Sequence, residues 1–477
     1  MTIAVSVVVP VYNPGRYLDP LLRSLDRQSL PTERFETVFV DDGSTDGTAG
    51  LLDAWCADRE NAHVIHQANH GWPGQPRNVG IAAARGSYIQ FVDQDDWLGD
   101  EALERLTSYA DANGSDVVVG KMVGVDRRVP TALFRRSVPR AQIGVDRIED
   151  SQTPHKMFRR AFLDRIGLRF PEDTRRLEDH LFVTAAYLRA DVVSVYAETD
   201  CYFHTSRDDG RNAGFRSYDP VPYYAVVEEV IDLVEDHLPA GAARERYLSR
   251  WLRNELIGRL RSPIVRDLPT ARRQVFYDEV SRIVRQRYAP TALRATTATV
   301  AVGAAIARHA PMSEFYRADD ALHRIDVRAW EDDGGIGLEL MDAGRTLTPG
   351  TTLAAVLRAH LSPSIVEPVL ADLGARAAER VVPDRITRIS GAPRTVFTGD
   401  GVVFRAPDAT AHAGDRIRVA SALGPRETTV TAERRRGGGG SGAVAGRRRA
   451  ARRLKDWTVR LLPSRVRRVF RRRPRPR

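Results

Sequence analysis

Cysteine and long apolar runs are scarce in this sequence of 477 residues. Its two cysteines, Cys56 and Cys201, exclude a disulfide framework and a cysteine metal cluster. No apolar run approaches the ~20 residues that a bilayer-spanning helix needs. The first residues, MTIAVSVVVPVYN, have no basic region and no small-residue cleavage site, and they predict a buried strand rather than a signal peptide. These absences favour a cytoplasmic protein.

Charge is distributed unevenly along the chain. The formal net charge is +10, from 72 Lys and Arg against 62 Asp and Glu. Residues 434–477 hold 18 of the bases and a single acid, Asp456, which leaves 54 bases and 61 acids in residues 1–433. The body is therefore mildly acidic, and the tail is strongly basic. Such a tail is typical of contact with a polyanion or an anionic membrane.

The first 120 residues alternate between short β-branched runs and helical patterns. The apolar runs at 5–10, 35–40, 62–67, 88–92 and 116–120 predict five strands of a mostly parallel α/β sheet. Ligands of such sheets bind at the carboxyl ends of the strands. Three polar clusters fall there, 10–12, 41–42 and 93–96, so we expect one site along this rim.

Four regions follow from the patterns. Residues 1–216 are expected to form the α/β domain, 217–320 a helical linker, and 321–433 a β-rich domain in which the run TTLAAVLRAHL also fits a helix. Residues 434–477 contain the flexible linker GGGGSG at 437–442 and continue as a basic segment with Leu454, Trp457 and Leu461 on one helical face. This segment suits a membrane interface. The alternative is a disordered tail that binds any polyanion; nucleic acid is a weak candidate, because no motif offers a reading surface.

Acidic residues end two of the predicted strands. Asp93 and Asp95 form an Asp-X-Asp pattern, whose hard oxygens suit Mg2+ or Mn2+ together with a substrate diphosphate. The pattern also occurs by chance, but its position after a buried strand favours a metal site. Asp42 could accept hydrogen bonds from ribose or a base, whereas a turn and helix cap would explain only Ser44, Thr45 and Asp46.

Three further segments carry polar side chains. Arg77, at the start of a predicted helix, would aim a guanidinium toward a phosphate or base. Glu178 and Asp179 precede an apolar helix and are either helix-terminal charges or a general base near an acceptor hydroxyl. The loop at 201–214 contains Arg207 and Arg211, which would balance a departing diphosphate. The histidine in the same loop, at position 204, is better explained as structural.

Four stretches carry a resemblance to a known family: VSVVVPVYNPGRYLDPLLRSLDRQ, VFVDDGSTDGT, ARGSYIQFVDQDDWL and LEDHLF. In sequence they resemble the successive motifs of inverting family 2 glycosyltransferases, which have the GT-A nucleotide-sugar fold, and the resemblance covers about residues 4–215. GWPGQPRNVG, KMVGVDRRVPTALF, TPHKMFRRAFL and FPEDTRRLEDHLF are similar to the wall-teichoic-acid transferases that add β-N-acetylglucosamine to poly(ribitol phosphate). Those enzymes use UDP-GlcNAc, a divalent metal and an Asp base. Some also have a helical linker and C-terminal β domains that trimerise.

The resemblance implies roles for the residues that bind the nucleotide. Pro10, Tyr12 and Asp42 would hold the uracil and ribose. Asn69 and Arg77 would line the uridine pocket.

The resemblance also implies the reacting groups. Asp93 would touch the ribose or the sugar, and Asp95 would ligate Mn2+ or Mg2+. Asp179 would be the catalytic base, with Glu178 beside it on the sugar or acceptor. Arg207 would face the diphosphate. On this view the three acids at 93–96 are tolerated because a metal ion and a diphosphate complete the charge balance.

Two positions depart from the family pattern. Arg211 stands where the family has a histidine on the diphosphate loop, so a cation is kept but not a metal ligand. Trp72 replaces a small residue beside the pocket, which leaves the identity of the sugar open.

The expected function is therefore metal-dependent, inverting transfer of a sugar, with GlcNAc as the first choice, from a UDP-sugar to an anionic cell-wall polyol-phosphate polymer. The enzyme would lie at the inner face of the membrane, held there by its tail, and a homotrimer is possible. One alternative is transfer of another UDP-sugar to a capsular or lipid-linked glycan. A non-catalytic scaffold that binds glycan or membrane is disfavoured, because the carboxylates at 95 and 179 are both present.

Overall fold

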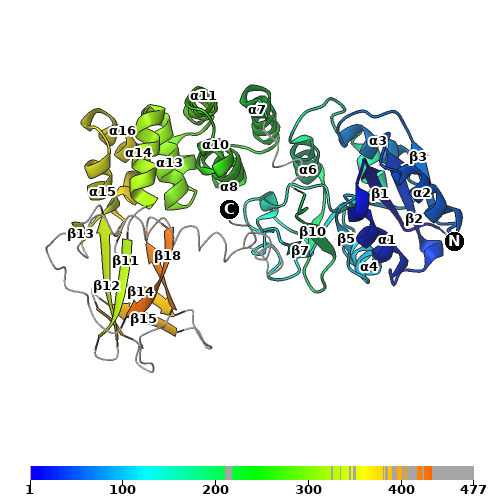
Figure 1. Cartoon of the computed structure of the whole chain (residues 1–477), viewed down its shortest axis with the longest axis horizontal. Helices are drawn as coiled ribbons and strands as arrows, with labels where there is room; N and C mark the ends of the chain where they lie inside the picture. Colours follow the sequence, from blue (N-terminus) through cyan, green and yellow to red (C-terminus); the bar gives the residue numbers. More distant parts are fainter. Residues whose placement is uncertain are drawn as a thin grey trace, which may run out of the picture.

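The structure is a computed structural model and extends from one mixed sheet, through a layer of helices, to a second sheet (Figure 1). Arg211 and the basic tail at 434–477 lie outside the described residues. The residues described are 2–209, 218–323, 326–332, 335–342, 345–347, 351–379, 381, 385–388, 395–399, 403–405, 416–421 and 424–431.

The N-terminal sheet has seven strands in the spatial order β3-β2-β1-β4-β8-β6-β9. The β1–β2, β2–β3, β1–β4 and β6–β9 pairs are parallel, which confirms the predicted parallel-rich sheet. β8 runs antiparallel to both β4 and β6 and was not predicted, because three residues are too few to show a pattern. The strands are β1 (Val5–Val11), β2 (Phe35–Asp41), β3 (Ala62–His66), β4 (Tyr88–Phe91), β6 (Val117–Gly120), β8 (Met157–Arg159) and β9 (Val193–Tyr196).

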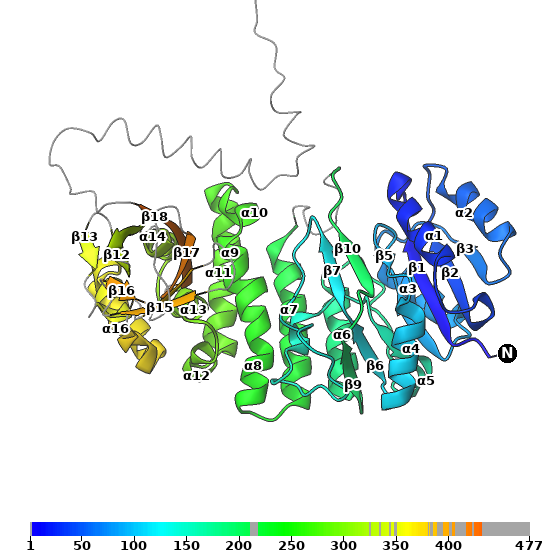
Figure 2. The same ribbon diagram turned by 90° about the horizontal axis from the view of Figure 1, so that it is seen from below.

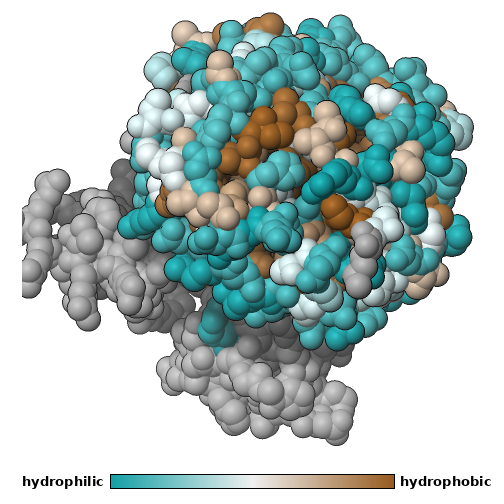
Figure 3. All heavy atoms as spheres, turned by 90° about the vertical axis from the view of Figure 1, so that its right-hand side faces the viewer, coloured by the Kyte–Doolittle hydropathy of each residue, from teal (hydrophilic) through white to brown (hydrophobic). Residues whose placement is uncertain are grey.

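Burial explains the continuous apolar runs of the central strands. Every residue of β1 and of β2 is buried, as expected for parallel strands covered on both faces. Helix α3 packs so closely on β1 that a Cβ atom at Gly80 would lie 2.2 Å from Val8 Cγ1. The helices of this domain are α1 (Leu18–Asp26), α2 (Thr48–Ala57), α3 (Gly74–Ala83), α4 (Ala102–Asn113), α5 (Arg160–Arg165) and α6 (Glu178–Arg189), with short 3-10 turns η1 (Gly15–Tyr17), η2 (Thr32–Arg34) and η3 (Ile148–Asp150). Viewed end-on, the surface of this domain is mostly hydrophilic, with hydrophobic residues gathered near its middle (Figure 3).

A small sheet joins the rim to the chain that follows it. β10 (Tyr202–Thr205) pairs antiparallel with β5 (Trp97–Leu98) and parallel with β7 (Met122–Val125). Trp97 stacks on Phe203 with ring centroids 5.4 Å apart. This pairing places the Asp93–Asp96 turn, just before β5, beside the loop that follows β10.

The expected helical region is present and stands between the two sheets (Figure 2). α6 of the first domain packs against α7, and α11 packs against both α7 and α13. No helix among the described residues has both the length and the apolar character to span a membrane. The elements are α7 (Pro220–His237), α8 (Ala242–Trp251), a π-helical segment η5 (Leu252–Ile257), α9 (Gly258–Arg261), α10 (Pro263–Arg266), α11 (Thr270–Arg287), α12 (Pro290–Arg294), α13 (Ala298–His309) and α14 (Met312–His323).

The C-terminal part combines strands with two helices. α15 (Leu353–His360) includes most of the run that also fitted a helix, and α16 (Pro363–Leu373) packs on α12 and α13. A 3-10 turn, η6 (Gly374–Ala378), follows α16. Eight strands pair in the order β11-β18-β17-β14-β15-β16-β12-β13, and β11 also pairs with β12. They are β11 (Asp326–Asp332), β12 (Gly335–Asp342), β13 (Arg345–Leu347), β14 (Arg385–Arg388), β15 (Thr395–Gly399), β16 (Val403–Arg405), β17 (Arg416–Ser421) and β18 (Gly424–Thr431).

Candidate active site

The carboxyl end of β1 is tied directly to the acidic turn. The backbone N–H of Tyr12 donates to Gln94 Oε1 at 2.7 Å, and Gln94 Nε2 donates back to the Tyr12 carbonyl at 3.1 Å. Pro10 is the sixth residue of β1, and the Tyr12 side chain is 46% exposed. The structure thus brings together two of the predicted rim clusters and leaves the tyrosine ring open to a ligand.

Asp41, the last residue of β2, and Asp42, the residue after it, accept hydrogen bonds from different segments. Asp42 is buried and accepts from the backbone of His70 at 2.9 Å and of Gly71 at 3.3 Å, while Asn69 Nδ2 donates to the Asp42 carbonyl at 2.9 Å. Asp41 instead accepts from the backbone of Ser44 at 3.1 Å within the turn. Asp42 and Asn69 are therefore neighbours, and Asp42 shapes the loop before α3. Their contact with a nucleotide stays a prediction.

Arg77 connects the two acidic clusters. Its buried guanidinium donates to Asp93 Oδ1 at 2.9 Å and to Glu178 Oε1 at 3.1 Å. Trp72 Nε1 donates to the other oxygen of Glu178 at 2.8 Å. The guanidinium predicted to line the uridine pocket is thus held between two carboxylates, and Trp72 stands beside one of them.

Two of the three acids in the turn are satisfied by protein groups. Asp93 accepts from Arg77 and also from His155 Nε2 at 2.8 Å, and although burial opposes the shift, these two partners lower the pKa of Asp93. Asp96 accepts from the Tyr202 hydroxyl at 2.7 Å and from the Thr205 backbone at 2.7 Å, and it lies 2.9 Å from His204 Nδ1. The expectation that a metal and a diphosphate balance all three acids is therefore too broad.

Ligand atoms of Asp96, His155 and His204 lie within 4.8 Å of one another, which is close enough for a metal cluster. Both oxygens of Asp96 already accept hydrogen bonds, however, and His155 stacks on Tyr202 with ring centroids 4.3 Å apart. This group is better described as the buried hydrogen-bonded support of the turn. His204 belongs to it, in agreement with the structural role expected for that residue.

Asp95 is the acid of the turn that fits a divalent cation. Burial, together with the negative charges of Asp96 and Asp93, raises the pKa of Asp95 to about 7, while Arg207 opposes the shift. A carboxylate in an excess of negative charge is stabilised by a bound cation, and its hard oxygens suit Mg2+ or Mn2+. The residues present therefore fit the metal that was expected.

Burial opposes the shift, but Asp209 and then the charge of Asp95 in the turn raise the pKa of Arg207. Its guanidinium lies over the Tyr17 ring, 4.2 Å from the centroid, and donates to Asp209 at 2.7 Å. The positive charge of Arg207 therefore acts on Asp95, the candidate metal ligand, and could also stabilise a diphosphate bound there.

The predicted base begins α6. The residue before this helix, Leu177, has φ of +65°, a left-handed conformation that is strained for a branched side chain and frequent at functional sites. Burial, together with the adjacent Glu178, raises the pKa of Asp179 to about 7, against the lowering effects of Arg77 and Arg250. A carboxylate with a pKa near the working pH is suited to accept a proton.

Sequence reasoning missed the residues that support the two reactive acids from a distance. They include His155 beside Asp93, the buried Lys156, and Arg250 of α8. The run TPHKMF contains the first two, but nothing in it indicated their contacts with the rim.

Architecture and site together define a GT-A nucleotide-sugar-binding domain, with acids at the carboxyl ends of its strands. Residues 6–169 match the family model described as glycosyl transferase family 2. Residues 220–318 match the model of the TarS linker domain.

Individual relatives agree with these matches. The chain is 36% identical over 233 residues to the poly(ribitol-phosphate) beta-glucosyltransferase of Bacillus spizizenii, covering 48% of this chain and 37% of the relative. It is also 36% identical over 240 residues to the poly(ribitol-phosphate) beta-N-acetylglucosaminyltransferase TarS of Staphylococcus aureus, covering 49% of this chain and 42% of the relative. The chain thus spans about two fifths of the length of these curated relatives.

Solved structures extend the likeness into the helical linker. Residues 1–349 of S. aureus TarS, in complex with UDP-GlcNAc, superpose with a TM-score of 0.61 at 26% identity, covering 72% of this chain and 99% of that one. The longer S. aureus TarS structure covers 91% of this chain and 79% of its own, with a TM-score of 0.60 at 20% identity, which speaks for the fold alone.

Proposed function

We propose that this protein transfers a sugar from a UDP-sugar to a hydroxyl group of an anionic cell-wall polyol-phosphate polymer, with inversion at the anomeric carbon. One observation carries the proposal. Arg77 donates to Asp93 of the acidic turn and to Glu178 at the start of α6, and the acids close to these two in the chain, Asp95 and Asp179, each have a pKa raised to about 7. An acid that fits a diphosphate-bound cation and an acid that fits a base are the two groups that this reaction requires.

The chemistry follows from these positions. Asp179 accepts the proton of the acceptor hydroxyl. At the same time the oxygen of that hydroxyl forms a bond to the anomeric carbon, from the face opposite to UDP. The bond from that carbon to the diphosphate oxygen breaks, and its electron pair leaves with UDP. Arg207 supplies positive charge to the departing diphosphate. A divalent ion bound by Asp95 would neutralise further charge on the same diphosphate.

The sugar is the finer part of the proposal. The two curated relatives named above are equally identical to this chain, yet one is named for glucose and the other for N-acetylglucosamine. We choose GlcNAc, because the TarS structure that superposes on most of this chain is a complex with UDP-GlcNAc. Another UDP-sugar with a capsular or lipid-linked acceptor is the alternative, and the side chain of Trp72, hydrogen-bonded to Glu178, is a candidate determinant of the choice.

Calorimetric titration tests the donor and the metal together. UDP-GlcNAc, UDP-glucose and UDP-galactose are titrated into the full chain with and without Mn2+, and into Asp95→Ala. We expect tight binding of one donor that depends on Mn2+ and is lost in the variant. The matched control is Asp100→Ala, which removes an exposed carboxylate paired with Arg27. Absence of binding by every UDP-sugar would contradict the proposal.

We also propose that the basic tail holds the enzyme at the inner, anionic face of the membrane. The support is its composition, 18 bases against one acid, with Trp457 among leucines at helical spacing. Truncation at Gly437 should abolish sedimentation with phosphatidylglycerol vesicles. Equal sedimentation of the full and truncated chains would refute the attachment.

A further inference from the structure

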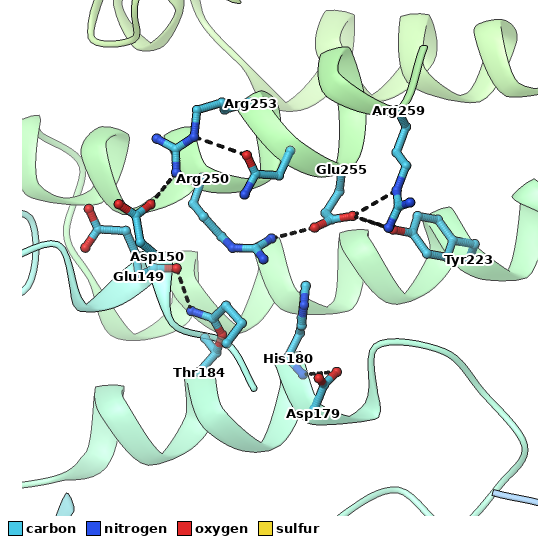
Figure 4. A network of polar contacts seen from close by, with 12 residues as sticks. Glu149, Asp150, Asp179, His180, Thr184, Tyr223, Arg250, Arg253, Glu255 and Arg259 are labelled. Carbon is cyan, nitrogen blue, oxygen red and sulfur yellow. Dashed lines mark hydrogen bonds and ion pairs between the residues drawn. The ribbon is translucent and has the colours of Figure 1, made fainter. Parts of the chain in front are cut away.

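A buried charge cluster lies where the helical linker meets α6 (Figure 4). Arg250 of α8 donates to Glu255 Oε1 at 2.7 Å, and Arg259 of α9 donates to Glu255 Oε2 at 3.2 Å. The hydroxyl of Tyr223, from α7, also donates to Glu255. Although burial alone would raise the pKa of Glu255, the two arginines hold it well below its usual range. Glu255 is therefore an ionised, buried partner of both guanidiniums.

The charges of this cluster do not cancel. Arg250 is 8% exposed and Glu255 is 5% exposed, and two guanidiniums share the one carboxylate. Buried charge without compensation is costly, so the excess positive charge needs an anionic neighbour. On the other side of the interface, acids outnumber the arginine. Arg77 donates to both Asp93 and Glu178, and a third acid, Asp179, follows Glu178 in the chain. Each side thus carries the charge that the other lacks.

Asp179 lies at the junction of the two sides, because the residue after it, His180, contacts Trp251 of the linker and the residue before it, Glu178, accepts from Arg77. On its own helix, Glu178 raises the pKa of Asp179, and His180 stays neutral because burial and then Arg250 lower the pKa of that histidine to about 3. From α3, Arg77 lowers the pKa of Asp179; from the chain before β8, the buried Lys156 faces it, with a pKa that burial lowers to about 7. Arg250 is the linker residue whose charge also lowers the pKa of Asp179.

The linker is docked firmly enough to hold this charge in place. Trp251 meets His180 edge to face, with ring centroids 6.2 Å apart. Arg253 pairs with Asp150 of η3, and Arg175 pairs with Glu229 of α7 at 2.8 Å. Glu255 itself belongs to the π-helical segment η5. This conformation is rare in proteins as a whole, and where it occurs it is often at a functional site.

We propose that Arg250 is a positioning residue for the Asp179 carboxylate, so that the linker completes one wall of the active site instead of acting as a spacer. This inference rests on the proposed function in taking Asp179 as the base. Arg250 does not touch the reacting atoms; its charge and packing keep the base ionised and oriented at the start of α6.

The kinetic test uses the full chain and three variants. Arg250→Met should move the acidic limb of the kcat profile up by about one pH unit, because removal of a nearby cation raises the pKa of a carboxylate. At pH 7 that shift lowers kcat by about fivefold, while KM for the UDP-sugar stays unchanged. Arg250→Lys should restore most of the profile. Arg253→Met, which breaks the separate pair with Asp150, should leave the limb in place. Superimposable limbs for Arg250→Met and the unaltered protein would overturn the inference.

A second readout does not depend on catalysis, so failure of the proposed function can be told apart from failure of this inference. Thermal unfolding is followed from pH 5 to pH 8.5 for Arg250→Met, Asp179→Asn and the double variant. Glu255 keeps Arg259 and Tyr223 in the first variant, so we expect it to fold. Arg250→Met should lower Tm more above pH 7, where Asp179 is ionised, than at pH 5, and this extra loss should vanish in the Asp179→Asn background. An equal loss at every pH in both backgrounds would refute the coupling even if the enzyme is active.

Discussion

The acidic turn after β4 and the start of α6 are built alike, although they are distant in the chain. Each contributes one carboxylate to Arg77, Asp93 from the turn and Glu178 from the helix. Each also has a second carboxylate whose pKa burial raises to about 7, Asp95 in the turn and Asp179 in the helix. In both regions, one acid pairs with Arg77 and the other has a raised pKa.

The two regions differ in the charges around the reactive acid. Asp95 faces two further carboxylates, and Arg207 is the cation among the main contributors to its pKa. Asp179 faces a single acid, Glu178, and cations on α3 and in the linker. An excess of negative charge suits a divalent ion, whereas an acid partly balanced by fixed cations suits reversible protonation. These surroundings favour the proposed assignment of Asp95 to a metal and of Asp179 to proton transfer.

The largest expected effect is on catalysis at the second region. Asp179→Asn removes the proton acceptor but keeps the size of the side chain, so kcat should fall by about 10²–10⁴, with UDP-sugar binding retained. Release of UDP in the presence of acceptor measures the rate. Asp173→Asn, an exposed acid shortly before the same helix that pairs with Arg175, is the control and should be nearly unchanged. A kcat within a few fold of the unaltered protein would remove Asp179 from the role of base.

The next largest effect is on stability, in a variant that removes Arg77, the residue that pairs with an acid of each region. Arg77→Met leaves the buried Glu178 and the partly buried Asp93 without their guanidinium, so the free energy of unfolding should fall by about 3–5 kcal/mol. Denaturant titration of the full chain at pH 7.5 measures the change. Arg27→Met removes an exposed pair with Asp100, with side chains 50% and 58% exposed, and should cost about 0–1 kcal/mol. Equal losses in the two variants would mean that Arg77 does not organise the rim.

The smallest effect is the pH dependence of kcat and of stability in the unaltered protein, which reports on the pKa of Asp179. Because the pKa of Asp179 is raised to about 7 in the folded chain, the base is protonated below that pH. With saturating donor and Mn2+, kcat should fall about tenfold per unit below pH 7 and level off above it. Stability should run the other way, because the folded state binds this proton more tightly than the unfolded state, and ionisation between about pH 4 and 7 therefore disfavours folding. A kcat profile that is flat from pH 5.5 to 8 would contradict the raised pKa.

Local patterns in the sequence predicted much of the first domain. The runs at 5–10 and 35–40 became β1 and β2, because unbroken apolar β-branched runs suit strands buried on both faces. The rim acids followed from their positions after strands. β8 escaped prediction because it has three residues, although it places His155, two residues before it, beside Asp93. Lys156 and Arg250 escaped because an isolated basic residue in a sequence does not indicate burial.

The sequence by itself determined which residue types stand at the carboxyl edge of the sheet, since parallel strands expose these ends on one side wherever the helices pack. Only the tertiary structure decided which of these acids are paired with cations and which have a raised pKa. The pKa of a carboxylate depends on burial and on charges within a few ångströms, and here those charges come from α3, from the chain before β8 and from the linker. The same acid would have an ordinary pKa on an exposed helix end, so its chemistry belongs to the assembled fold.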